Sequence, residues 1–176
     1  MSDLPNDAYW VTQGSVMAGP YPGERRKEDA VNTLTALTDA GVTHFIDLTF
    51  PKGESTDSLE PYECLLDRLP NGNLPGYSRF SIVDQYIPTQ EFMGEILDEI
   101  GSLLGRGEVV YVHCWGGVGR TGTVVACHLI DAGMTANQAL DFLQSARRDL
   151  IRGHRPSPEM PEQEAFVRAW VDRQAP

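Results

Sequence analysis

The chain alternates between short apolar runs and longer segments whose apolar residues recur every three or four positions. The short runs predict strands at Tyr9–Thr12, Val16–Ala18, Val42–Leu48, Ser78–Val83 and Glu108–Val112. After Pro88 and Thr89, the apolar residues fall on one helical face: Phe92, Met93, Ile96, Leu97, Ile100, Leu103 and Leu104. This longer segment therefore predicts an amphipathic helix that packs on a sheet.

End signals mark further helices along the chain. A helix over about 26–39 stops before Gly41, a short helix is predicted at Tyr62–Leu69, and another helix begins near Arg120. Glycine and proline are frequent in the loop around the short helix, between residues 50 and 76. This long loop joins two of the predicted strands.

Two helices are predicted in the last third of the chain. Thr135 and Gln138 form a capping-box pair for a helix that extends to about Arg148. Ser157 and Pro158 start the last helix, whose inward residues are Phe166, Val167, Trp170 and Val171. Strands that alternate with helices predict an α/β fold with a central, mostly parallel sheet flanked by helices. We expect a single domain over residues 1–176, with its core at about 9–172.

Composition narrows the possible partners. The 176 residues carry 25 acidic and 14 basic side chains, a formal net charge of −11, which argues against nucleic acid or an anionic membrane as the main partner. Four arginines nevertheless lie close together: Arg147, Arg148, Arg152 and Arg155. A solvated basic helix end is favoured for them over a rim that attracts phosphate.

The cysteines and the N-terminus indicate a reducing compartment. The three cysteines, Cys64, Cys114 and Cys127, do not have the paired spacing of a disulfide framework. Residues 1–10 lack the charged start and apolar run of a signal peptide, and the apolar runs are too short to span a bilayer. We expect a cytoplasmic protein. No His, Cys or carboxylate spacing predicts a metal site, and no cofactor is implied.

The segment 108–124, EVVYVHCWGGVGRTGTV, carries the strongest chemical signal. A predicted strand leads into Cys114, a glycine-rich loop follows, and Arg120 opens a helix. Glycines allow a tight ring of backbone N–H groups, and the N-terminus of the helix adds its dipole. The guanidinium of Arg120 matches two phosphate oxygens. This arrangement predicts an anion site built around a cysteine.

The same surroundings favour the reactive thiolate form of Cys114. Thr121 follows Arg120 and could donate its hydroxyl to that thiolate. The alternative is a buried structural cysteine before an ordinary strand-to-helix turn, which is disfavoured because the combination HCxxGxGRTG is specific. A nucleotide-binding P-loop is also disfavoured, since no Gly-Lys-Ser or Gly-Lys-Thr occurs.

Residues His113–Gly122 resemble the signature loop of the protein tyrosine phosphatase superfamily, closest to its compact dual-specificity members. The resemblance implies that Cys114 is the nucleophile and forms a phosphocysteine, while Arg120 binds phosphate and stabilises the transition state. It also implies that His113 orients the loop and that Thr121 assists breakdown of the intermediate. The phosphate-binding loop then comprises Trp115, Gly116, Gly117, Val118 and Gly119.

The resemblance also implies a general acid on a loop upstream of the nucleophile. Asp84, just past the strand predicted at Ser78–Val83, is the best candidate. Asp47 is the rival, at the end of a predicted strand, and Asp57 and Glu60 in the long loop are weaker candidates. The alternative for Asp84 is a residue that only ends the strand or caps a turn.

Two further residues are candidates for the same site. The family often places a glutamine where Gln163 stands, to position the hydrolytic water, and an ordinary solvent-facing glutamine is an equal alternative. Arg155 is expected near the phosphate pocket. Cys64 is a candidate for a protective disulfide with Cys114 under oxidation.

The predicted activity is hydrolysis of phosphotyrosine in a protein or peptide, with phosphoserine and phosphothreonine left open. Trp115 and Val118 are uncharged, and the superfamily's phosphoinositide phosphatases often carry lysines there, so a lipid substrate is disfavoured. Two alternatives remain: a phosphoprotein-binding module without turnover, and a sulfurtransferase. The presence of a cysteine, an arginine and an acid disfavours the first, and the Arg120-Thr121 pair disfavours the second.

Overall fold

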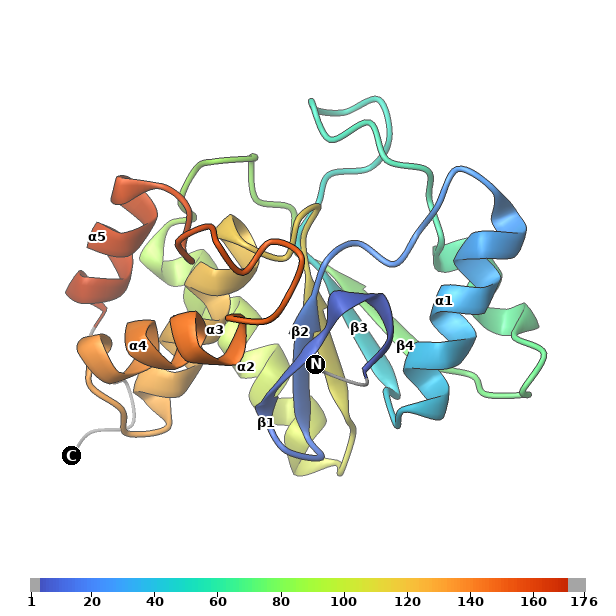
Figure 1. Cartoon of the computed structure of the whole chain (residues 1–176), viewed down its shortest axis with the longest axis horizontal. Helices are drawn as coiled ribbons and strands as arrows, with labels where there is room; N and C mark the ends of the chain where they lie inside the picture. Colours follow the sequence, from blue (N-terminus) through green and yellow to red (C-terminus); the bar gives the residue numbers. More distant parts are fainter. Residues whose placement is uncertain (1–3, 171–176) are drawn as a thin grey trace.

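A five-stranded, mostly parallel sheet runs through the molecule, seen in a computed structural model that describes residues 4–170 (Figure 1). In chain order the strands are β1 (Tyr9–Thr12), β2 (Val16–Gly19), β3 (His44–Asp47), β4 (Gly76–Arg79) and β5 (Val110–His113). Their order in the sheet is β1-β2-β5-β3-β4, and only the β1–β2 pair is antiparallel. The predicted fold class is confirmed.

Helices cover both faces of this sheet (Figure 1). On one face lie α2 (Gln90–Gly105), α3 (Gly119–Asp131), α4 (Ala136–Ala146) and α5 (Pro161–Ala169), and on the other lies α1 (Lys27–Asp39). Successive side chains of a strand point to opposite faces. Val110 and Val112 accordingly join the larger apolar cluster, whereas Tyr111 joins the smaller one beneath α1. The central strand β5 is therefore buried on both sides.

Capping signals in the sequence locate two helix starts correctly. The Thr89 side chain accepts the backbone N–H of Phe92 at 3.1 Å, which begins α2. Thr135 and Gln138 form the predicted capping box at the start of α4. Both caps satisfy N–H groups that a helix terminus would otherwise leave without partners.

Other predicted boundaries are wrong by a few residues. The strand expected at Ser78–Val83 is instead β4, which starts and ends earlier. The backbone beyond it still follows β3, because the N–H groups of Phe80 and Ile82 donate to the carbonyls of Asp47 and Leu48. The last helix begins at Pro161 rather than at Ser157, since the Ser157 hydroxyl donates to the Val118 carbonyl in the loop before α3.

Two 3₁₀ segments complete the described chain. The short helix predicted at Tyr62–Leu69 is a 3₁₀ helix, η2 (Glu63–Arg68), and an unpredicted one, η1 (Pro5–Asp7), precedes β1. The predicted inward residue Val171 lies outside the described residues. Across residues 4–170, none of the helices has the length and apolar character needed to cross a membrane.

The arginine cluster that follows α4 is not wholly solvated, contrary to expectation. Arg147 is only 2 % exposed, and its guanidinium donates to the carbonyls of Arg152 at 3.1 Å and Arg155 at 3.2 Å. Arg148, its neighbour, is exposed. Arg147 therefore fixes the path of the chain between α4 and α5.

Replacing Arg147 by Met should lower the free energy of unfolding by about 1–3 kcal/mol, because the partly buried carbonyls of Arg152 and Arg155 lose their charged donor. Met retains most of the apolar stem, so the loss reports the hydrogen bonds. Arg148→Met is the matched control and should stay within about 0.5 kcal/mol of the parent. Urea denaturation measures both, and equal stabilities for the two variants would show that Arg147 does not hold this segment.

Candidate active site

The loop between β5 and α3 lies at the carboxyl end of the central strand. We call residues 114–120 the phosphate loop. Cys114 begins it and is 3 % exposed, and Val118, the N-cap of α3, makes no side-chain capping hydrogen bond. The first N–H groups of α3 are therefore available to an anion held above Cys114.

Glycine is required in this loop for backbone and steric reasons. Gly117 has a φ of +67°, and a Cβ placed there would lie 2.4 Å from the carbonyl carbon of Gly19. A Cβ at Gly119 would lie 2.9 Å from Oε1 of Gln163. A side chain at Gly117 would push the loop away from the backbone of Gly19, whereas one at Gly119 would displace the amide of Gln163.

Arg120, on the first turn of α3, is 1 % exposed and points into the site. Its Nη1 and Nη2 atoms donate to the two carboxylate oxygens of Asp57 at 2.9 and 2.8 Å, and Nη1 also donates to the Ile82 carbonyl at 3.0 Å. The Nε atom is buried and has no hydrogen-bond partner within the described chain. The edge formed by Nε and Nη2 is thus the part of the guanidinium that can receive phosphate oxygens.

Asp57 is a site residue that sequence reasoning ranked too low. Both of its oxygens are engaged by Arg120, and Oδ2 also accepts the Phe50 N–H at 3.1 Å. Burial acts to raise the pKa of Asp57, but the hydrogen bonds from Arg120 and Phe50 outweigh it and hold that pKa below its usual value. Asp57 comes from the long loop, 63 residues before Arg120, and no local motif marks it.

The predicted acid Asp84 lies in the same site. Its Oδ1 is 2.9 Å from Nη2 of Arg120, and its side chain is 34 % exposed. We call residues 84–88 the acid loop. Asp84 differs from Asp57 because its closest contact with the guanidinium is through one oxygen and its side chain reaches solvent.

The other two candidates for the acid, Asp47 and Glu60, are bound to other side chains. Asp47 is fully buried, its Oδ1 accepts the N–H and hydroxyl of Thr49, and its Oδ2 accepts the Tyr77 hydroxyl at 2.8 Å. Glu60 forms an ion pair with Lys52. Neither carboxylate pairs with Arg120 in the described structure.

Gln163 joins the phosphate loop to the acid loop. It is fully buried, its Oε1 accepts the Met160 N–H, and its Nε2 donates to the Tyr86 carbonyl, both at 3.2 Å. The solvent-facing alternative for this glutamine is therefore wrong. Arg155, expected near the pocket, is exposed and pairs with Glu159, and the arginine that lies against the phosphate loop is Arg152, beside Gly116.

Thr121 and the cysteines are the remaining candidates from the sequence. The Thr121 hydroxyl is buried and has no hydrogen-bond partner among the described residues, so its proton is available to a neighbouring thiolate. Cys64 is exposed, and Cys114 and Cys127 are buried. The Cys64–Cys114 disulfide stays a prediction for oxidising conditions.

His113 anchors the base of the phosphate loop. Its Nε2 lies 2.6 Å from the Tyr62 hydroxyl, and its Nδ1 lies 3.9 Å from Oδ1 of Asp47. Burial lowers the pKa of His113 to about 4, and the attraction of Asp47 only partly opposes this shift. The imidazole is therefore neutral at physiological pH and serves to position the loop.

The buried neutral His113 should make the protein less stable in mild acid. Above pH 6.5, His113 is neutral in both the folded and the unfolded protein. Below pH 6.5, His113 of the unfolded protein binds a proton, whereas His113 of the folded protein binds it only near pH 4. The free energy of unfolding should fall by roughly 3 kcal/mol across that window. Urea denaturation at pH 7, 6 and 5 measures this slope.

His113→Gln should flatten this slope, whereas His154→Gln, at an exposed histidine, should retain it. The burial-lowered pKa values of His44 and His128 add to the total slope, so the difference between the two variants is the relevant quantity. Identical slopes in both variants would contradict the role given to His113.

The chain matches the family described as PTP-SAK, a Swiss Army Knife protein DSP-PTPase phosphatase domain, over residues 5–167. It is 26% identical over 160 residues to "Phosphatidylinositol 3,4,5-trisphosphate 3-phosphatase and protein-tyrosine-phosphatase PTEN1" of Arabidopsis thaliana, covering 89% of this chain and 36% of that protein. It is 29% identical to the "Putative tyrosine phosphatase 067L" of Invertebrate iridescent virus 3, covering 94% and 65%. The chain thus spans only part of the length of these relatives.

Solved structures share the fold. Kinase associated phosphatase (KAP) superposes with a TM-score of 0.69 at 20% identity, covering 98% of both chains. The active form of Tk-PTP superposes with a TM-score of 0.65 at 23% identity, covering 98% of this chain and 99% of that one. The chain therefore belongs to the PTP-SAK family of phosphatase domains, as a compact, dual-specificity-like member of the protein tyrosine phosphatase superfamily.

Proposed function

We propose that this protein hydrolyses phosphotyrosine in proteins through a phosphocysteine intermediate. The observation that carries the proposal is the contact between Oδ1 of Asp84 and Nη2 of Arg120, which are 2.9 Å apart. Arg120 ends the same phosphate loop that Cys114 begins. A nucleophile, a phosphate ligand and an exchangeable acid meet there, which are the groups that phosphoryl transfer to a thiolate requires. Phosphoserine and phosphothreonine are left open as further substrates.

In the first step, the Cys114 thiolate attacks phosphorus and the bond to the tyrosine oxygen breaks. Arg120 and the backbone N–H groups of the phosphate loop bind the equatorial oxygens, where charge is shared in the transition state. Asp84 gives its proton to the leaving phenolate. Phosphate oxygens compete with Asp84 for Nη2 of Arg120, so bound substrate would release the Asp84 carboxyl group toward the leaving oxygen.

In the second step, water attacks the phosphocysteine and releases inorganic phosphate. Asp84, now a carboxylate, accepts a proton from the water, and the thiolate of Cys114 leaves. Gln163 lies between the two loops, where its amide can orient the water. The free hydroxyl of Thr121 can donate to the departing thiolate. Asp57 keeps the guanidinium of Arg120 in place throughout and is a positioning residue.

The surface around the site favours a phosphorylated protein. Trp115 and Tyr86, on the phosphate loop and the acid loop, are 52% and 67% exposed and offer aromatic surface to a phenyl ring. Val118 is buried and uncharged, so Arg120 is the only basic side chain within residues 114–120. A substrate with one phosphate and an aromatic body fits this environment better than a polyphosphate does.

A phosphorylated inositol or inositol lipid is the second candidate, because several similar proteins carry such names. They include the Arabidopsis relative, PTPMT1 in complex with PI(5)P, and the PP-IP phosphatase SIW14 of S. cerevisiae. Parallel assays with a phosphotyrosine peptide and with phosphoinositide vesicles separate the two candidates. Preference for the peptide supports the proposal, and turnover of the lipid alone overturns it.

Cys114→Ser should lower hydrolysis of a phosphotyrosine peptide by on the order of 10⁴ or more, as removal of a catalytic nucleophile does. The variant should still bind the peptide, because Arg120 and the loop N–H groups remain. Cys64→Ser makes the same change at an exposed cysteine and should retain activity. Steady-state kinetics and calorimetry measure both properties. Considerable turnover by the Cys114 variant would exclude the phosphocysteine route.

Asp84→Asn should lower kcat for phosphotyrosine by about 10²–10⁴, since the leaving oxygen loses its proton donor. Hydrolysis of p-nitrophenyl phosphate, which has a better leaving group, should fall much less, and the alkaline limb of the kcat profile should flatten. Asp57→Asn should slow both substrates alike and raise KM, because it loosens Arg120. The opposite pattern in the two variants would assign the acid to Asp57.

A further inference from the structure

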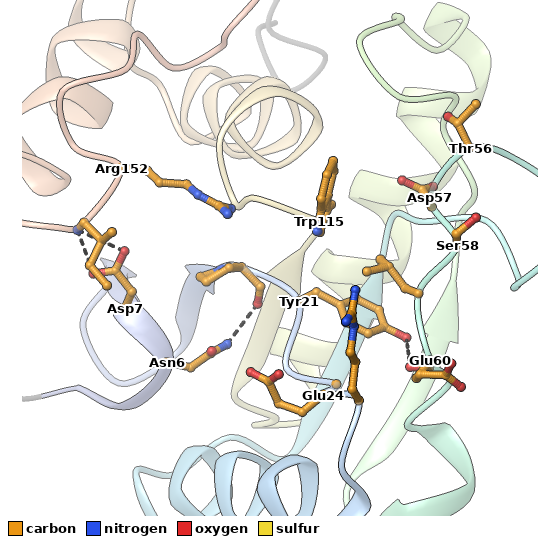
Figure 2. A pocket seen from close by; sticks show the side chains of 15 residues that line it. Asn6, Asp7, Tyr21, Glu24, Thr56, Asp57, Ser58, Glu60, Trp115 and Arg152 are labelled. Carbon is orange, nitrogen blue, oxygen red and sulfur yellow. Dashed lines mark hydrogen bonds between the residues drawn. The ribbon is translucent and has the colours of Figure 1, made fainter.

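A cavity of about 730 Å³ adjoins the phosphate loop (Figure 2). It lies between the segment at 151–152, the N-terminal segment that carries Asn6 and Asp7, and the long loop at 56–60. Trp115, which follows the nucleophile, forms part of its wall, and so does Asp57, which holds Arg120. The mechanism proposed for Cys114 makes no use of this space, although substrate bound at Arg120 would border it.

Arg152 stands where the cavity meets the phosphate loop. Its Nη1 lies 2.7 Å from the position that a Cβ on Gly116 would occupy, so the absence of a side chain at Gly116 makes room for the guanidinium. Figure 2 shows its side chain extending from the 151–152 segment toward Trp115. No carboxylate among residues 4–170 pairs with this guanidinium. A partly buried cation without a counterion is suited to an external anion.

Two acidic side chains of the cavity wall are paired with other cations. Asp57 is bound to Arg120, and Glu60 is paired with Lys52. Both oxygens of Asp7 accept the backbone N–H of Ile151 at 3.1 Å, a hydrogen bond that orients the carboxylate but leaves its charge. None of these three carboxylates forms an ion pair with Arg152 among the described residues.

Glu24 and Arg25 are the other charged residues of the wall, and neither makes an ion pair with another described residue. Arg25 and Arg152 are thus the two cations of the wall, and Asp7 and Glu24 are its two carboxylates that pair with no described cation. These charges balance, so the wall as a whole does not select an anion. Arg152 is the cation of the wall that lies against the phosphate loop, so an anion carried next to a phosphate bound at Arg120 would meet it.

We propose that this cavity is a second substrate subsite, in which Arg152 binds a carboxylate or phosphate on a residue next to the phosphotyrosine of a peptide. The inference rests on the proposed function, and it names the kind of sequence that the enzyme prefers. Trp115, Tyr21 and Leu59 provide apolar wall for the peptide between the two anions. With only two arginines and this apolar surface, the cavity suits one additional anion better than the several phosphates of an inositol polyphosphate.

The test compares pairs of phosphotyrosine peptides. The two peptides of a pair differ only by Glu or Gln, either directly before or directly after the phosphotyrosine. At one of these positions the wild-type enzyme should show a Glu-to-Gln ratio of kcat/KM of about ten or more, as a net charge-assisted hydrogen bond implies. Arg152→Ala should bring that ratio close to one. Arg152→Lys should restore part of it, because an ammonium keeps the charge without the planar fork.

Arg155→Ala is the matched control, since it removes an equal charge from the same segment, where Arg155 is paired with Glu159. It should keep the wild-type ratio. If Arg152 only braces Gly116, Arg152→Ala will slow Glu and Gln peptides by the same factor, and the subsite is overturned. A wild-type ratio near one on well-hydrolysed peptides also overturns it and leaves the proposed function intact.

Failure of the proposed function gives a different result. Wild-type enzyme that hydrolyses p-nitrophenyl phosphate but neither series of peptides would overturn both the phosphotyrosine substrate and the peptide in the cavity. If Arg152→Ala selectively impaired hydrolysis of inositol polyphosphates, the cavity would serve an inositol phosphate and the peptide assignment would be wrong. Raising the salt concentration should lower the Glu-to-Gln ratio of the wild type, because the discriminating contact is electrostatic.

Discussion

The buried ion pair between Arg120 and Asp57 is the interaction on which the rest of the site depends. Both partners have left water, and each terminal nitrogen of the guanidinium binds one carboxylate oxygen. Removing one partner of such a pair typically costs about 3–5 kcal/mol, because the other charge is left buried without a partner. The pair therefore fixes the long loop over the sheet and, at the same time, orients the free edge of Arg120 toward the phosphate position.

The geometry of this pair also explains how two acidic residues at one arginine can differ in role. Asp57 binds through both oxygens and is inaccessible, so it remains an anion and acts on the reaction only through Arg120. Asp84 contacts the guanidinium through one oxygen and is 34 % exposed. In the proposed mechanism, the carboxylate that is bound most strongly to Arg120 therefore holds the arginine in place, and the more exposed one serves as the acid.

Sequence reasoning could bring candidate residues together where the determinants are local. Cys114, the glycines and Arg120 lie within seven consecutive positions between a strand and a helix, and the strand–loop–helix path alone brings them around one centre. Gln163 was found through resemblance, but its burial between two loops depends on how α5 packs on α3. Asp57 was ranked only as a weaker candidate for the acid, and Arg152 was grouped with arginines expected in solvent, because each lies on a loop far from the signature segment in the sequence. Arg147 was misassigned to solvent for the same reason, since its partners are carbonyls of a later turn.

The overall charge of the molecule makes short-range contacts decisive. A chain with a formal net charge of −11 repels phosphorylated substrates at long range, although salt screens that repulsion beyond about 8–10 Å. In the resting site, Asp57 and Asp84 offset the charge of Arg120, so little attraction extends into solvent. In the proposed mechanism, affinity arises after contact, when phosphate takes the place of Asp84 on Arg120. Selectivity then depends on groups within hydrogen-bonding reach, and the proposed role of Arg152, at the edge of the phosphate loop, follows from this requirement.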